Sequence, residues 1–353
     1  MTRPEIEQIH RNNRRSIILI VVLLIATIIV SLASLSVSTI DIGFWESFQI
    51  IIDHLNGIEP SDFRSTLKDT VVFSENVPRC LGALIAGAVL SISGALLQSL
   101  IRNPLAEPYT LGISSGAMFG MVLSVGLGIS IVPFLSSSDG MIINAFVFSL
   151  IPTAVVILVA MFKKVTPTMM ILCGIGVMYV FTALTTLVKY SVDPDTLSSI
   201  YQWSIGSVSG LSYGSIEKML IALAIAVVPL FFIHRRVDIV AQGDETAISL
   251  GINPNRLRIV ALVFVSMATA IVVCYTGTIS FVGLVAPHIA RRVVGNTSKY
   301  MIPASAVIGS LMVVSADYIV HEFTPTLPVG VILALVCSPI FIYILIKMKK
   351  NSW

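Results

Sequence analysis

Long apolar runs recur along the whole sequence, and they constrain its fold more than any other feature. A helix needs about 20 apolar residues to cross a bilayer core about 30 Å thick. We count ten candidate spans, at residues 17–37, 80–101, 111–132, 142–162, 169–188, 215–233, 257–274, 279–294, 301–320 and 327–346. The chain is therefore expected to be an all-α polytopic membrane protein with ten transmembrane helices.

Composition excludes a soluble globular domain. Hydrophobic residues make up 56% of the 353 residues and charged residues only 12%, whereas soluble domains carry about 25% charged residues. A basic stretch precedes the first span and no A-x-A-like cleavage site follows it, so we interpret it as an uncleaved span. No added soluble domain is evident, and a single transmembrane domain is expected over residues 1–353.

The basic residues indicate the orientation, because lysine and arginine stay preferentially on the cytoplasmic side. With the N-terminus inside, ten spans place most of the 22 basic residues on the inner side, including Lys163, Lys164, Lys349 and Lys350. We therefore expect cytoplasmic N- and C-termini, a cytoplasmic tail at 1–16, an outer loop at 38–79 and a cytoplasmic hairpin at 234–256. The net charge of +3 reflects this topology and does not indicate a nucleic-acid partner.

Several kinds of site are missing from the sequence. No glycine is followed by lysine, so the chain lacks a G-x-x-x-x-G-K-[ST] phosphate loop, and ATP would have to bind to a partner. No H-E-x-x-H motif occurs and the four cysteines lie in or beside apolar spans, so no metal site is expected. Asp317 is the one carboxylate well inside a span, either as an interfacial or hydrogen-bonded group or as a part of gating or packing.

One motif could indicate an enzyme. Residues 112–116 match G-x-S-x-G, the nucleophile elbow of serine hydrolases, but an elbow needs a strand before Ser114 and a proline-interrupted loop precedes it here. A stripe of small residues, which lets helices approach closely in lipid, explains the glycines better. That stripe comprises Gly112, Gly116, Gly120, Ser124 and Gly128, and the second span carries a matching set of Ala83, Gly87, Ser91 and Ala95.

Two inner segments carry turn signals. Asn103–Pro104 is typical of a helix N-cap followed by a first-turn proline, and Glu107–Pro108 breaks the chain again, which predicts a short stiff connection. In the hairpin, Asp244 can cap a short helix, Gly251 can end it in the left-handed conformation, and Asn253–Pro254 can start another. Such a hairpin is either a docking surface or an ordinary ordered loop.

Four long blocks carry a family resemblance. They are VPRCLGALIAGAVLSISGALLQSLIRNPLAEPYTLGISSGA at 77–117, GDETAISLGI at 243–252, GTISFVGLVAPHIARRVVG at 277–295 and TPTLPVGVILALVCSPIFIYIL at 324–345. These blocks resemble the permease subunits of the iron-siderophore, haem and cobalamin (FecCD-type) family of ABC importers, and they occur in the family's order. The resemblance implies a type II ABC importer permease fold, in the cell membrane of a prokaryote. The first 76 residues resemble the family only in their organisation, which is a cytoplasmic tail, a span and an outer loop.

The resemblance also implies partners. Two permease subunits would surround a central pathway, with two ATPase subunits beneath them and a substrate-binding protein outside. ATP and magnesium would bind to the ATPase, whereas this chain would bind no cofactor and catalyse no reaction. The hairpin would sit in the ATPase cleft and move as a rigid lever when the ATPase dimer closes; its residues at matching positions are Glu245, Ala247, Leu250 and Gly251.

The same resemblance assigns a gate and a docking face. Residues at matching positions are Asn103, Leu105 and Thr168 in the cytoplasmic gate, and Arg79 and His321 at the outer docking face. Arg79 matches an arginine that pairs with the binding protein, whereas His321 stands where the family often has another arginine. Docking would therefore use fewer salt bridges, or rely on Lys68 and Arg64.

Two further segments fit this picture. The span 279–294 is short and is interrupted by Gly283 and Pro287, as expected of a broken helix that lines a cavity or packs inside protein. The Ser/Gly-rich segment 201–214 is predicted to form a short amphipathic helix at the outer mouth.

Two rival functions predict other features. An ion- or proton-coupled secondary transporter would show inverted repeats and charges within spans, which we do not find, and a membrane-embedded hydrolase would depend on Ser114. The favoured cargo is a ferric siderophore, followed by haem or cobalamin. The sequence does not show whether the second permease is an identical copy.

Overall fold

The computed structural model describes residues 3–38, 40, 42–132, 134, 137–162, 166–324 and 327–347. Within these ranges the chain is helical and has no strand. Its helices are α1 (Arg3–Ser36), α2 (Phe44–Leu55), α3 (Phe63–Asp69), η1 (Thr70–Asn76), α4 (Val77–Ile101), η2 (Pro108–Leu111), α5 (Ile113–Leu127), α6 (Ser137–Phe162), α7 (Pro167–Lys189), α8 (Pro194–Ile205), α9 (Tyr213–Gln242), α10 (Asp244–Ser249), α11 (Pro254–Thr276), α12 (Val282–Val294), α13 (Ser298–Phe323) and α14 (Val329–Lys347). The start of the predicted tail (1–2) and the predicted inner-side residues Lys163, Lys164, Lys349 and Lys350 lie outside the described residues.

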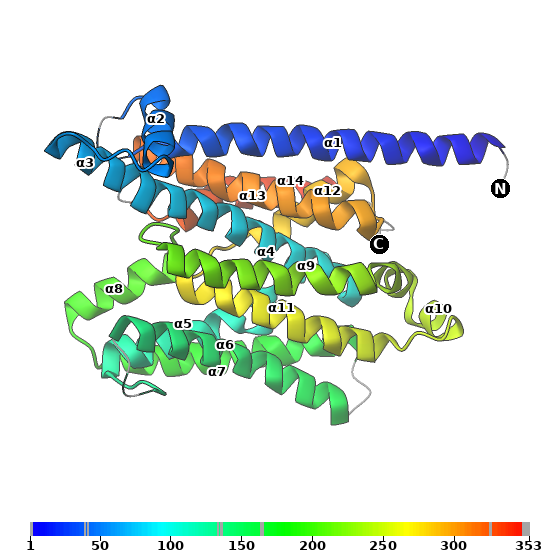
Figure 1. The fold of residues 1–353 in the computed structure, drawn as a ribbon. Coiled ribbons are helices and arrows are strands. Elements are labelled where there is room, and N and C mark those ends of the chain that lie inside the picture. Colours follow the sequence, from blue (N-terminus) through cyan, green and yellow to red (C-terminus); the bar gives the residue numbers. More distant parts are fainter. Residues whose placement is uncertain are drawn as a thin grey trace.

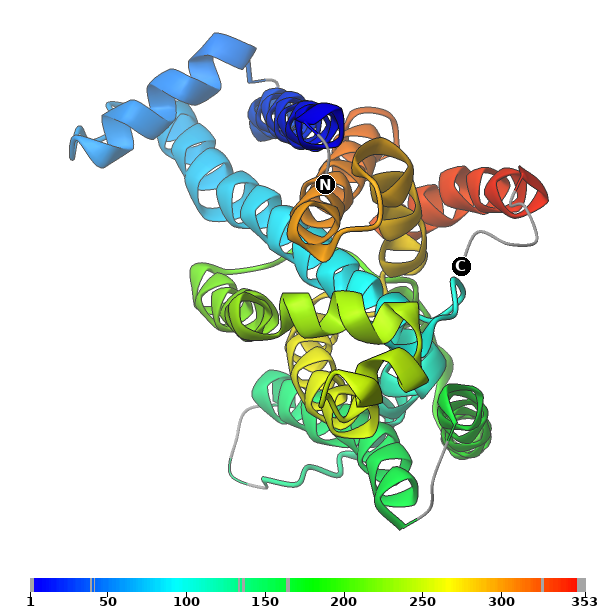
Figure 2. The same ribbon diagram turned by 90° about the vertical axis from the view of Figure 1, so that its right-hand side faces the viewer.

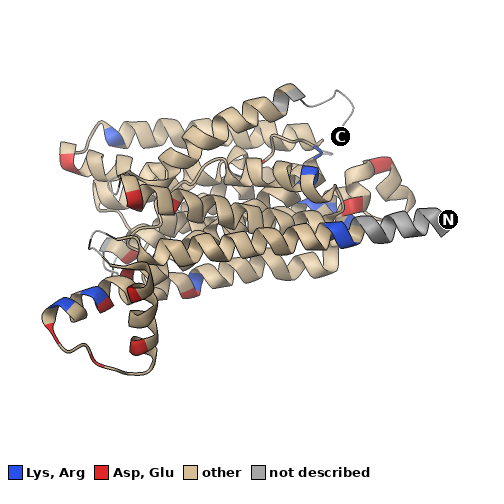
Figure 3. Ribbon diagram, turned by 90° about the horizontal axis from the view of Figure 1, so that it is seen from above, with Lys and Arg blue, Asp and Glu red and all other residues tan. Residues whose placement is uncertain are grey.

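The long apolar helices lie side by side in one bundle (Figure 1). Seven helical segments are long and apolar enough to cross a membrane, and α5 and most of α14 are shorter apolar helices. Charged residues gather at the two ends of the bundle and leave its middle almost free of them (Figure 3), as the cost of burying charge in lipid requires. Each predicted span falls largely on a helix, but α12 has only 13 residues, so the number of crossings stays a prediction.

α4 lies at the centre of the bundle, and most of its side chains are buried. It packs against α9, α11, α12 and α13. These contacts depend on glycine, because a Cβ at Gly87 would overlap the backbone of Gly309 in α13, and a Cβ at Gly94 would overlap the backbone of Gly283 in α12. The predicted small-residue face of the second span is therefore a site of close helix contact.

The glycine stripe predicted for the third span marks close contacts at Gly112, Gly116 and Gly120, but not at Gly128. Gly116 and Gly120 lie against backbone carbonyl groups of α6, where no Cβ would fit. Gly112 and Gly128 instead have positive φ values of +87° and +67° and mark the two ends of α5. Glycine adopts this left-handed backbone without steric cost, so both residues delimit the helix. Gly112 also packs closely, because a Cβ there would lie 3.0 Å from Pro152 Cβ, whereas a Cβ at Gly128 would meet nothing within 4 Å.

The predicted outer loop 38–79 is mostly helical. It contains α2, α3 and η1, and η1 continues directly into α4. Ile50 and Ile51 of α2 pack with Val71 and Val72 of η1 in a small apolar cluster. The loop prediction missed these elements because α2 and α3 are too short to stand out as membrane spans.

The helix predicted at 201–214 is displaced. α8 ends at Ile205, where Gly206 turns the chain with φ +80°, and the next residues are not helical. Ser207 N donates a hydrogen bond to Thr276 O (2.8 Å) at the end of α11. This glycine- and serine-rich segment is therefore a non-helical connection whose backbone passes beside the end of α11.

Candidate functional site

The predicted hairpin forms at the end of the bundle where α1 begins (Figure 1). α9 runs on to Gln242, α10 follows, and Gly251 (φ +76°) turns the chain toward α11 as predicted. Ala247 is buried and anchors α10, whereas Glu245 and Leu250 are exposed. The hairpin thus presents an acidic and an apolar side chain to its surroundings. The second predicted short helix is the first turn of α11, which Asn253 caps by accepting from Arg256 N at 3.1 Å.

Asp244 does not cap α10, in contrast to the prediction. Gly243 is the N-cap residue, and Asp244 begins the helix. Its carboxylate accepts two hydrogen bonds from the guanidinium of Arg258 in α11, at 2.6 Å (Oδ1 to Nη2) and 2.9 Å (Oδ2 to Nη1). These hydrogen bonds hold the pKa of Asp244 below its ordinary value, so the carboxylate stays charged at neutral pH.

Arg258 joins the hairpin to the end of α4. Its side chain is only 1% exposed, and Nε donates a hydrogen bond to Leu100 O at 2.9 Å. Leu100 lies in the last turn of α4, where helix carbonyl groups lack partners within the helix. One planar guanidinium therefore holds α10 and α4 together. This role of Arg258 was not predictable from the sequence, because no pattern links positions that lie 158 residues apart.

The turn after α4 holds two of the predicted gate residues. Arg102 ends α4 with a left-handed backbone (φ +52°), and Asn103 Oδ1 accepts a hydrogen bond from Leu105 N at 2.9 Å. Asn103 therefore closes a tight turn on its own backbone, rather than capping a helix as predicted. The connection is short and stiff, as expected, and it leaves the Leu105 side chain exposed.

Glu107 lies in the same connection and is partly buried. Burial raises the pKa of its carboxyl to about 7, because a charge is unfavourable away from water. The segment that carries the predicted gate therefore contains a group that titrates near neutral pH.

Thr168, the third predicted gate residue, is exposed in the first turn of α7. α7 packs against η2 at Gly174, where the missing Cβ lets the backbone of Thr110 and Leu111 approach. A concave surface of about 650 Å³ lies between the start of α7 and the hairpin, and it is lined by Thr166, Pro167, Asp244, Ile248 and residues 251–255. The start of α7 and the hairpin thus share one surface.

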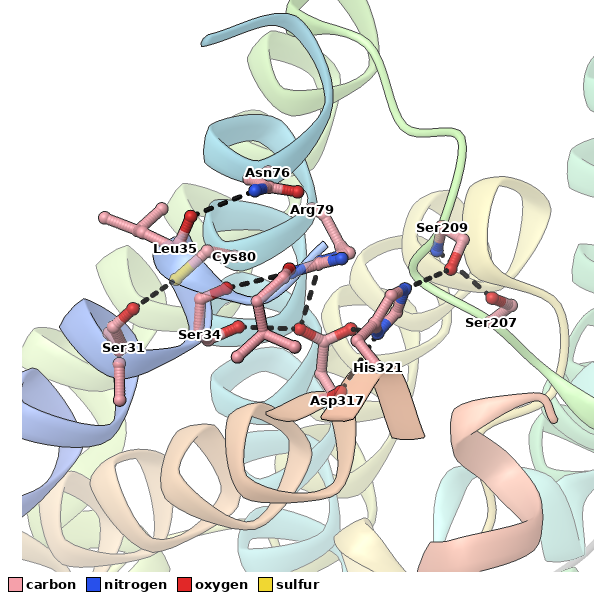
Figure 4. A network of polar contacts seen from close by, with 12 residues as sticks. Ser31, Ser34, Leu35, Asn76, Arg79, Cys80, Ser207, Ser209, Asp317 and His321 are labelled. Carbon is pink, nitrogen blue, oxygen red and sulfur yellow. Dashed lines mark hydrogen bonds and ion pairs between the residues drawn. The ribbon is translucent and has the colours of Figure 1, made fainter. Parts of the chain in front are cut away.

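A second polar cluster surrounds Asp317 (Figure 4). It includes Ser34 in the last turn of α1, so it lies at the end of the bundle opposite the start of α1 (Figure 1). Asp317 is 0% exposed, and its Oδ2 lies 3.2 Å from Arg79 Nε and accepts a hydrogen bond from Ser34 Oγ at 2.9 Å. Its Oδ1 lies 3.2 Å from His321 Nδ1. Of the two readings of Asp317, the structure supports a buried hydrogen-bonded group that ties α1, α4 and α13 together.

This cluster accounts for both residues predicted at the docking face. Arg79 is 5% exposed, and its Nη2 donates to the carbonyl oxygens of Ser34 and Val37, both at 2.9 Å, at the end of α1. His321 is also largely buried, and its Nε2 lies 3.3 Å from Ser209 Oγ. The guanidinium caps the orphan carbonyls of α1, so its charge is used within the chain and argues against a surface salt bridge.

The features that suggested other chemistry have structural explanations. Ser114 lies in the first turn of α5, and the preceding element is η2, a 3-10 turn in place of the strand that an elbow requires. Among the described residues, no group of three His, Cys, Asp or Glu side chains could hold a metal ion. All four cysteines are free, and three are buried, as expected of packing residues.

Comparison with known proteins agrees with this architecture. The FecCD transport family matches residues 23–347. The Fe(3+)-citrate import system permease protein YfmE of Bacillus subtilis is 31% identical over 344 residues, which cover 95% of this chain and 96% of the relative. The iron(3+)-hydroxamate import system permease protein FhuG of the same organism is 33% identical over 292 residues, which cover 79% and 84%.

A solved structure confirms the predicted fold class. A transporter assigned to the metal-chelate type of ABC transporters, in an inward-facing conformation, matches with a TM-score of 0.80 and 25% sequence identity, covering 94% of this chain and 99% of the other. The chain therefore belongs to the FecCD transport family and is a membrane permease of the ABC transporter class, with no catalytic role of its own.

Proposed function

We propose that this permease carries a metal chelate into the cell, with a ferric siderophore as the favoured cargo, and that ATP hydrolysis by a separate subunit drives the transport. The permeases for Fe(3+)-citrate and iron(3+)-hydroxamate import among its relatives support this cargo class. Haem and cobalamin are the next candidates. ATP and magnesium belong to the ATPase, in agreement with the missing phosphate loop.

The main support for this proposal is the hairpin around α10 and its contacts with α4 and α11. In our interpretation, Glu245, Leu250 and Gly251 contact an ATPase subunit, and Ala247 fixes α10 to its own bundle. Movement of α10 would be transmitted to the end of α4 through Asp244 and Arg258, because the Arg258 guanidinium also donates a hydrogen bond to the Leu100 carbonyl. The gate turn begins two residues later at Arg102, so movement of the hairpin would shift Asn103 and Leu105.

The gate itself would form between two permeases. Exposed apolar residues along α7 and α14, among them Leu172 and Leu335, provide a surface that a second permease could cover. Leu105 and Thr168 would meet their counterparts across that interface at the cytoplasmic end. In this topology both termini are cytoplasmic, and α2 and α3 lie outside the cell.

Docking of the outer binding protein needs a revised assignment. Arg79 and His321 are held in the Asp317 cluster, and Lys68 pairs with Glu46 of α2. Arg64 in α3 is exposed. We therefore propose Arg64 as the docking charge, together with the rim of a cavity of about 500 Å³ that is lined by Glu75, Ser209, Gly210 and Ser212 among others.

Two substitutions at Gly251 test the coupling role. A Cβ at this position meets no atom within 4 Å, so any effect arises from the backbone at φ +76°. Valine strongly disfavours this conformation, whereas asparagine tolerates it. We expect Gly251→Val to abolish uptake of iron-55 siderophore at unchanged membrane abundance, and Gly251→Asn to retain most of the uptake.

A purification with the neighbouring ATPase tests the proposal as a whole. The wild-type permease should form a stable complex, and its ATPase rate should respond to the binding protein. Failure to form that complex, or equal uptake by both Gly251 variants, would count against the proposed function. A secondary transporter would instead show uptake that depends on an ion gradient and not on ATP.

A further inference from the structure

The amphipathic helix α2 has three distinct faces, and one of them is apolar and is not covered by the part of the chain that the structure describes. Ser47, Ile50 and Ile51 face inward, where the two isoleucines pack with η1. A polar face follows, formed by Glu46, Gln49 and Asp53. The third face comprises Phe44, Trp45, Phe48, Ile52 and Leu55, whose positions recur at helical spacing.

This third face is exposed to an unusual degree. Trp45 is 80% exposed and Leu55 is 72% exposed, and Phe44 and Ile52 are exposed as well. Hydrophobic side chains gathered on one face normally indicate a surface that something else covers. We call these five residues the α2 apolar face.

The position of α2 indicates what covers it. The helix lies outside the bundle at the end opposite α10, and it runs across the direction of α1 rather than along it (Figures 1 and 2). α1 is itself apolar and mostly uncovered, with only 11% of its most apolar stretch buried. Because α1 would face lipid along its length, α2 lies where that lipid surface ends, at the headgroup region.

We infer that α2 is an interfacial anchor that lies in the membrane surface, with its apolar face toward the acyl chains and its polar face toward water. Tryptophan favours this depth because its ring is apolar and its indole N–H can bond to water or headgroups. Under the topology proposed above, this is the outer leaflet, but the inference itself requires only that the bundle spans a membrane.

The charges near α2 indicate how it would bind. The polar face contains no lysine or arginine, and the nearby Lys68 pairs with Glu46. Arg64 is exposed, but its charge is offset by the carboxylates of Glu46 and Asp62. His54 forms a second pair, with its Nδ1 2.8 Å from Asp69 Oδ1. Attraction to anionic headgroups therefore contributes little, and burial of apolar area is the driving force. We expect the anchor to bind zwitterionic and anionic lipid surfaces alike.

Tryptophan fluorescence tests this placement. The chain has three tryptophans, so Trp203→Phe with Trp353→Phe leaves Trp45 as the single reporter. In phosphatidylcholine vesicles, bromine atoms near the top of the acyl chains should quench most of its emission, and iodide in the water should quench little. Adding phosphatidylglycerol should leave both results unchanged.

A matched variant reports on the opposite face. In the same background, Trp45→Phe with Gln49→Trp moves the single reporter to the polar face and should reverse the result, with strong quenching by iodide and little by bromolipid. Quenching of Trp45 by iodide and not by bromolipid would overturn the inference. Equal quenching of the two reporters would also overturn it. So would protection of Trp45 from iodide that appears only when the soluble binding protein is added. Uptake and thermal stability of each variant establish that the fold is intact.

Discussion

At the scale of the residue, two arginines each make a set of hydrogen bonds that a lysine could not make. Arg79 closes the end of α1 and neutralises the buried Asp317, and Arg258 connects the hairpin to α4. Both use the planar fork of the guanidinium, which donates in several fixed directions at once. Neither role was predictable from the residue type, because arginine near a membrane surface more often follows the positive-inside rule.

Arg258→Lys tests the link between the hairpin and the gate. Lysine keeps the charge but cannot hold both oxygens of Asp244 and the Leu100 carbonyl together. We expect about tenfold less chelate to be taken up per ATP hydrolysed, while ATP hydrolysis itself continues. Arg256→Lys is the matched control, because Arg256 is exposed two residues away. Equal coupling in both variants would remove Arg258 from the proposed path.

Glu107 predicts a dependence of stability on pH. Its pKa is raised from 4.5 to about 7, so between these values the folded protein binds a proton that the unfolded chain has lost. The free energy of unfolding therefore falls as the pH rises from about 4.5 to 7 and stops falling from this cause above that. Glu107→Gln keeps the shape without the titration, and thermal unfolding in detergent from pH 5 to 8 should show a smaller slope. Identical slopes would contradict a buried carboxyl at this position.

At the scale of the element, packing in the bundle depends on helices that approach backbone to backbone. A Cβ at Gly94 of α4 would overlap the Gly283 carbonyl of α12, and backbone cannot yield as a flexible side chain can. The general lesson is that a small-residue pattern predicts close contact but not which helix supplies the partner.

Gly94→Ala measures this contact. We expect destabilisation of about 1–3 kcal/mol or more from overpacking, seen as a lower midpoint of thermal unfolding in detergent. Gly176→Ala in α7 is the control, since a Cβ there meets nothing within 4 Å and alanine favours the helix. A similar loss of stability in both variants would show that the close contact between α4 and α12 is not tight.

At the scale of the whole molecule, the structure separates two polar systems at opposite ends of an apolar bundle. The hairpin, Arg258 and the proposed gate turn lie at one end, and the Asp317 cluster, which contacts the last turn of α1, lies with α2 at the other (Figure 1). The first system connects the elements that we propose to move during transport. The second fastens α1 to α4 and α13, and removes two candidate docking residues from the surface.

The sequence by itself determined the helical class, the membrane setting, the family and the place of the hairpin. It could do so because these features depend on neighbouring residues. Apolar runs indicate membrane helices, Gly251 favours a left-handed turn, and Asn253 caps the helix that follows it. It failed where a side chain's partner lies far away along the chain. The sequence predicted Asp244 to be a helix cap and Arg79 to be a surface charge. In the fold, Asp244 pairs with Arg258 and Arg79 pairs with Asp317. Only the tertiary structure decides such pairings, because a buried charge takes the partner that packing places within hydrogen-bond distance.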